Sequence, residues 1–72
     1  MITRELIKQN PDNYNKYFDW LEKLRQSGVT NMYGASPYIE AHFNVNEDEA
    51  IEILAYWMDH YSELLKKRGW KR

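Results

Sequence analysis

"HFNVNEDEAIEIL", residues 42–54, decides the fold, because it holds the end of one helix, a short turn and the start of another. Asn44 suits the left-handed backbone that often ends a helix. Asn46 is a good N-cap, and Glu49 three residues later completes the spacing of a capping box. The stretch therefore predicts two helices joined in the manner of a helix-turn-helix pair.

The second helix of this pair is expected to be long, covering residues 47–67 after a shorter helix at 37–43. Cations at 66–68 suit its last turn, where they meet the negative end of the helix dipole, and Gly69 ends it. Its apolar residues recur at spacings of three and four, which is the pattern of one buried helix face. That face consists of Ala50, Leu54, Trp57, Met58, Tyr61 and Leu65, widened by Ile51 and Ile53.

The N-terminal half predicts two more helices, over residues 3–9 and about 11–26. Pro11 separates them, since it disfavours helical geometry in the residue before it and fits the first turn of a helix. The loop that follows is expected to be ordered, with two side chains turned inward, Met32 and Tyr33.

Length and composition bound the architecture. A chain of 72 residues is one domain at most, near the size where a single core is marginal. It has no cysteine, so packing must supply its stability, and six Tyr, three Trp and two Phe are available for that. We predict an all-α fold: a single domain over residues 1–72 with three to four helices, a helix-turn-helix-like pair and a long C-terminal helix.

Charge is strongly segregated although the net charge is only −1. Residues 37–63 carry seven acidic side chains and no Lys or Arg, whereas residues 64–72 carry five basic ones. No apolar run approaches the roughly 20 residues that span a bilayer, and the start, MITRELIKQN, lacks the apolar region of a secretory signal. We therefore expect a soluble cytoplasmic protein with no membrane contact.

The helix-turn-helix pattern has the wrong chemistry for reading DNA. The first turns of the second helix carry carboxylates where a recognition helix carries cations or amides, and carboxylates oppose contact with phosphate. We expect a well-capped helix packed on its predecessor. The four carboxylates are Glu47, Asp48, Glu49 and Glu52.

The basic C-terminal tail offers an alternative nucleic-acid contact. An aromatic side chain among cations suits single strands, because the ring stacks on a base while the cations hold phosphates. The competing interpretation is that cations at a helix end are ordinary dipole partners and that the Trp folds back onto the core. The residues concerned are Lys66, Lys67, Arg68, Trp70, Lys71 and Arg72.

Catalytic signals are weak. The two histidines, His42 and His60, fall on different predicted helices, and Ser36 is in place as a helix cap rather than a nucleophile. No glycine-rich phosphate loop follows a strand, and a metal would need further ligands from elsewhere. We therefore expect no enzymatic activity, no cofactor and no metal site.

One stretch resembles a known group of proteins. SGVTNMYGASPYIEAHFNVNEDEAIEILAYWM, Ser27 to Met58, is similar to a pattern in small uncharacterised proteins of phages and prophage-bearing bacteria. Its most specific part is the Asn-Met-aromatic-Gly-Ala-x-Pro loop, followed by a helix with a Trp-Met pair. The resemblance covers a little under half of the chain and implies a phage or prophage context, hence the bacterial host cytoplasm, but no activity.

The surplus of aromatic residues indicates the function. So short a chain buries only about 60% of its surface, so some aromatic side chains should stay exposed, as protein interfaces prefer, or lie half-buried around one core. We expect Tyr38, Tyr56, Trp20 and Trp70 to be the exposed ones. The predicted function is a small interaction module that binds a protein partner or forms a homodimer; the alternative is a nucleic-acid binder using the basic tail. The candidate protein interface is Tyr38, Glu52, Tyr56, Asp59 and His60.

Overall fold

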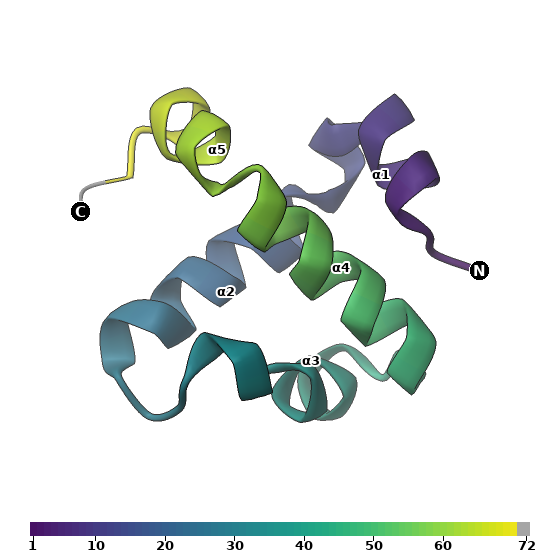
Figure 1. Cartoon of the computed structure of the whole chain (residues 1–72), viewed down its shortest axis with the longest axis vertical. Coiled ribbons are helices and arrows are strands. Elements are labelled where there is room, and N and C mark those ends of the chain that lie inside the picture. Colours follow the sequence, from purple (N-terminus) through teal and green to yellow (C-terminus); the bar gives the residue numbers. More distant parts are fainter. Residues whose placement is uncertain (71–72) are drawn as a thin grey trace.

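Five α-helices and two short 3-10 helices make up the computed structural model of the chain, which describes residues 1–70 (Figure 1). Within these residues no strand occurs, so the predicted all-α fold is confirmed. In chain order the elements are α1 (Arg4–Gln9), η1 (Pro11–Tyr14), α2 (Asn15–Ser27), η2 (Met32–Gly34), α3 (Ser36–Phe43), α4 (Glu47–Asp59) and α5 (Tyr61–Arg68).

The turn between α3 and α4 has the local structure that its sequence predicts. Asn44 ends α3 in the left-handed conformation, with φ 56° and ψ 42°. Asn46 accepts a hydrogen bond from the amide of Glu49 (2.8 Å), and its own amide donates to the Glu49 carboxylate (3.2 Å), which completes the capping box. This turn fixes how α4 leaves α3.

The N-terminal segment is tied to α4 by two carboxylates of that helix. The amide of Ile2 donates to Glu49 Oε2 (3.0 Å), and Arg4 Nε lies 2.9 Å from Glu52 Oε2. The hydrogen bonds from the amides of Ile2 and Asn46 lower the pKa of Glu49. As a result α1 lies along the side of α4 (Figure 1).

Removal of the capping side chain should weaken this region in a measurable way. Asn46→Ala is expected to lower the free energy of unfolding by about 1 kcal/mol, since it leaves an amide of the first turn without its acceptor. Asn46→Ser should retain most of the stability because Ser caps equally well. Urea denaturation of the two variants checks this, and equal losses in both would contradict the role given to the cap.

One core collects side chains from all five α-helices. The largest fully buried side chains are Phe18, Ile7, Leu21, Ile39 and Ile53, which come from α1, α2, α3 and α4. Trp57 is 3% exposed and belongs to the same cluster, which confirms its predicted place in the core. An α-helix that buries one stripe needs such partners on the facing helices.

The prediction of one long C-terminal helix is wrong. The helix stops at Asp59, and His60 (φ −113°, ψ 17°) turns the chain so that α5 folds back toward α2 (Figure 1). The turn buries Leu64, whereas Leu65, the residue expected from an unbroken stripe, is only partly buried. Contacts between α5 and distant side chains of α2, which helical periodicity does not encode, hold this arrangement.

Two aromatic side chains lie opposite to expectation. Tyr33 was expected to point inward but is 82% exposed, because the Asn31 side chain accepts from its amide (2.9 Å) and sets a tight turn that directs the ring outward. Met32 packs against the core as predicted. Tyr56 was expected at the surface but is 7% exposed, with its ring stacked on Phe18 at a centroid distance of 5.7 Å.

Candidate interaction surface

The five residues predicted as a protein interface do not form one accessible surface. Tyr38 and Asp59 are exposed. Glu52 is partly buried, and its carboxylate forms an ion pair with Arg4. Tyr56 belongs to the core, where burial raises its pKa. His60 is partly buried at the bend, with its ring stacked on Tyr56 at 4.0 Å. The prediction that Tyr56 belongs to the interface is therefore wrong, because its side chain is buried.

A different set of residues lines the outward side of α4. Asp48, Ile51, Ala55 and Asp59 follow one another at spacings of three and four, so they lie along one side of the helix. The two aspartates are exposed, Ala55 is half-buried, and Ile51 is 46% exposed. We call these four residues the α4 ridge. It presents a small apolar centre with a carboxylate at each end.

Ile51 was missed because the sequence alone assigned it to the buried face. Its neighbour Ala50 is fully buried, and one residue along a helix turns the side chain by about 100°. With the buried stripe centred on Ala50, Leu54 and Trp57, this rotation leaves Ile51 on the rim or outside. The centre of the buried stripe therefore already indicates that the side chain of Ile51 is exposed.

The carboxylates of α4 fall into two groups, those that contact the N-terminal segment and those that do not. Glu49 and Glu52 are used by the N-terminal segment, whereas Glu47 and Asp48 remain exposed. The helix itself carries no Lys or Arg. Its outward electrostatic character is thus acidic, which opposes phosphate and favours a cationic surface.

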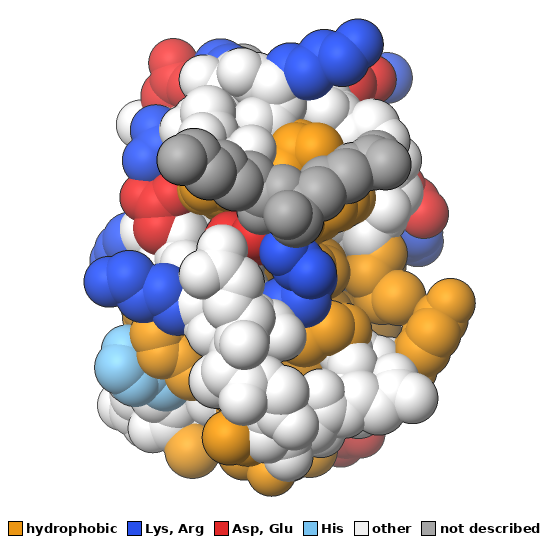
Figure 2. All heavy atoms as spheres, turned by 90° about the vertical axis from the view of Figure 1, so that its left-hand side faces the viewer, with side chains coloured by type: hydrophobic (Ala, Val, Ile, Leu, Met, Phe, Trp, Pro, Cys, Tyr) orange, Lys and Arg blue, Asp and Glu red, His pale blue; other side chains and the backbone are white. Residues whose placement is uncertain are grey.

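Three residues of the basic tail contact other parts of the molecule. Arg68 Nε donates to Asp19 Oδ1 of α2 (3.1 Å), and Lys67 Nζ lies 3.1 Å from Asp12 Oδ1. The ring of Trp70 is half-buried and stacked on Tyr61 at 6.0 Å. Figure 2 shows this side of the molecule, with cations and carboxylates interspersed among hydrophobic side chains. A nucleic acid would compete with these internal partners.

Three further residues of the predicted nucleic-acid set have a different status. Lys66 is exposed on α5. Lys71 and Arg72 lie outside the described residues. Within residues 1–70, Lys66 is therefore the one exposed cation of the predicted set that does not pair with Asp12 or Asp19.

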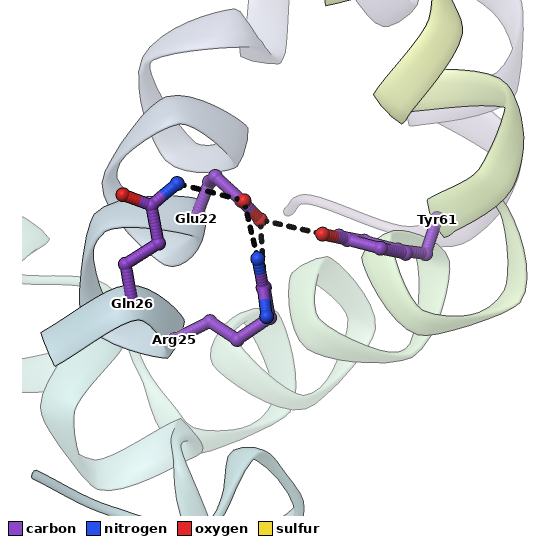
Figure 3. Close-up of polar contacts among 4 residues, drawn as sticks. All are labelled: Glu22, Arg25, Gln26 and Tyr61. Carbon is purple, nitrogen blue, oxygen red and sulfur yellow. Dashed lines mark hydrogen bonds and ion pairs between the residues drawn. The ribbon is translucent and has the colours of Figure 1, made fainter. Parts of the chain in front are cut away.

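A buried carboxylate joins α2 to α5, and no sequence pattern pointed to it directly. The Glu22 side chain is only 3% exposed. Arg25 donates to it twice, from Nε to Oε1 (3.0 Å) and from Nη2 to Oε2 (2.8 Å). Gln26 Nε2 donates to Oε2 (3.1 Å), and the Tyr61 hydroxyl donates to Oε1 (2.9 Å), as drawn in Figure 3. Every contact is charge-assisted and therefore strong for its kind.

Hydrogen bonding dominates the electrostatics of this cluster. Burial by itself would raise the pKa of Glu22, but the hydrogen bonds from Arg25, Gln26 and Tyr61 outweigh it, and the net pKa is lowered. The pKa of the Tyr61 hydroxyl is raised by burial and by its bond to the carboxylate. Glu22 is thus ionised and saturated with donors, and its role is to hold α5 in place.

Other kinds of site find no support within residues 1–70. This part of the chain shows no pocket, and no three His, Asp or Glu side chains come together as metal ligands. The two histidines are stacked on separate aromatic rings, His42 on Trp20 at 4.7 Å and His60 on Tyr56. None of the described helices is both long and apolar enough to cross a bilayer.

Comparisons with protein-family models, with curated proteins and with solved structures gave no match.

Proposed function

We propose that this chain is a non-enzymatic interaction module that binds a protein partner through the α4 ridge. The observation that carries the proposal is the position of Ile51, 46% exposed between Asp48 and Asp59 on one side of α4. Protein interfaces share this plan of an apolar centre within a polar rim.

The negative charge of α4 indicates the kind of protein surface that would be complementary to it. Because residues 37–63 contain no Lys or Arg and α4 directs Glu47, Asp48 and Asp59 outward, the partner should carry cations around a small apolar patch. Such complementarity accelerates association and makes it sensitive to salt. From the resemblance of residues 27–58 to phage and prophage proteins, we propose that this partner belongs to the cytoplasm of a bacterial host.

Ile51→Lys is the variant that tests the proposal. It puts a cation at the apolar centre, and capture of the partner should fall by roughly tenfold or more, as for a central interface residue. The fold should survive because the side chain is already about half exposed, with a melting temperature within a few degrees of wild type. The measurement is quantitative mass spectrometry of proteins that the immobilised chain retains from a lysate of its own cells.

Val29→Lys is the matched control. Val29 is also an exposed branched apolar residue, at 62%, but it lies in the loop between α2 and α3. Proteins retained by wild type and by Val29→Lys, lost with Ile51→Lys and released by salt would support the proposal. Retention that is equal for all three chains would exclude the α4 ridge as the contact surface.

A further inference from the structure

The connection between α4 and α5 is a single residue. α4 ends at Asp59 and α5 begins at Tyr61, with His60 between them. Neither Gly nor Pro occurs from Glu47 to Arg68, and the apolar spacing of the sequence runs through the bend. A modest change in the backbone of His60, now at φ −113° and ψ 17°, would therefore join the two helices into one.

α5 is held by side chains that any copy of the chain can offer. Tyr61 donates to Glu22, Arg68 pairs with Asp19, and Leu64 is buried in the core cluster. The acceptors on α2 lie 39 and 49 residues away in sequence. Nothing in these contacts requires that α5 and α2 belong to the same chain.

We propose that two copies of this chain exchange α5 by straightening the bend at His60, so that α5 of each copy lies on α2 of the other. Domain swapping exchanges an identical element between two copies, and here the exchanged form could reuse the α2–α5 contacts of the monomer while adding a continuous helix. The partner is therefore a second copy. This dimer does not use Ile51, so the proposal goes beyond the function proposed above and either can fail alone.

A charge exchange between Asp19 and Arg68 tests the proposal. In Asp19→Arg and in Arg68→Asp alike, the two residues repel within one monomer. When the variants are mixed in equal amounts, the α5-exchanged heterodimer is the form in which both contacts pair opposite charges. Light scattering after size-exclusion chromatography should show a dimer in the mixture, formed roughly tenfold more readily than by either variant alone.

Two controls keep the result decisive. The double variant Asp19→Arg/Arg68→Asp restores the pair within one chain and should behave as wild type. If either single variant is unfolded alone, mixing should restore the helical circular dichroism signal. A mixture that stays monomeric, or that stays unfolded while the double variant folds, overturns the proposal.

Ser62→Pro, added to both variants, identifies the straightened helix as the cause. Ser62 is exposed and is the second residue of α5, the position that Pro37 occupies in α3, so the bent monomer accepts proline there. Inside a continuous helix the same proline would lose an amide and clash with the preceding turn. Loss of the mixed dimer is the expected result, and a dimer that persists shows that the copies associate in another way.

Discussion

Trp57→Ala is expected to leave the protein largely unfolded at room temperature. The side chain is 3% exposed in the centre of the core cluster and meets the Tyr61 ring edge-on at 4.8 Å. Truncation of a large buried aromatic costs about 3–5 kcal/mol. In a chain this short a single core rarely supplies more than about 3–5 kcal/mol, so the truncation removes most or all of the stability.

Trp57→Phe separates apolar packing from the polar atom of the indole. Among residues 1–70, no hydrogen-bond acceptor serves the buried Nε1 of Trp57. Phenylalanine removes this unpaired donor and keeps most of the apolar volume, so it should cost clearly less than alanine. Urea denaturation followed by circular dichroism measures both variants. Similar losses of unfolding free energy in the two variants would mean that the exact shape of the indole ring, and not the amount of buried apolar surface, determines the effect.

The second large effect is expected at Glu22. Glu22→Ala should lower the free energy of unfolding by about 2–3 kcal/mol at neutral pH, because Tyr61 and Arg25 lose a charged acceptor in a protected place. Arg25 is about one third exposed and regains water, which keeps the loss below that of a fully buried pair. The measurement is chemical denaturation at pH 7, with Gln26→Ala as the control that removes one donor alone.

The same residue makes stability depend on pH in a stated direction. The folded-state pKa of Glu22 lies below its usual value of 4.5, so the unfolded chain takes up the proton more readily. The stabilisation is complete above the usual value and is lost as the pH falls through the folded-state pKa. The difference in unfolding free energy between wild type and Glu22→Gln should therefore shrink in acid. A difference that stays constant from neutral pH into acid would contradict the ionised, hydrogen-bonded state.

Local signals predicted the ends of α1 and α3 and the start of α4 to within about one residue. The capping box at Asn46 and the left-handed Asn44 depend on residues within one turn, and such short-range chemistry is legible in a sequence. The buried position of Trp57 follows from periodicity alone. These features can therefore be predicted from the sequence alone.

The bend at His60 could not be predicted from local sequence signals. It depends on Glu22, which lies 39 residues from its partner Tyr61, and helical periodicity is silent about such pairs. The only local trace was the spacing of Glu22, Arg25 and Gln26, which places donors one turn from the carboxylate. The exposure of Ile51, by contrast, could have been predicted, because its side chain lies about 100° around the helix from the buried Ala50.

The claim that α4 carries the contact surface can be tested by site-specific photo-cross-linking. Benzoylphenylalanine in place of Ile51 should capture one basic protein partner in cells that express the chain, and the cross-link should disappear when Asp48→Lys and Asp59→Lys are added. The same group in place of Val29 should capture none of it. Equal capture from both positions, or a cross-link indifferent to the two charge reversals, would contradict the account.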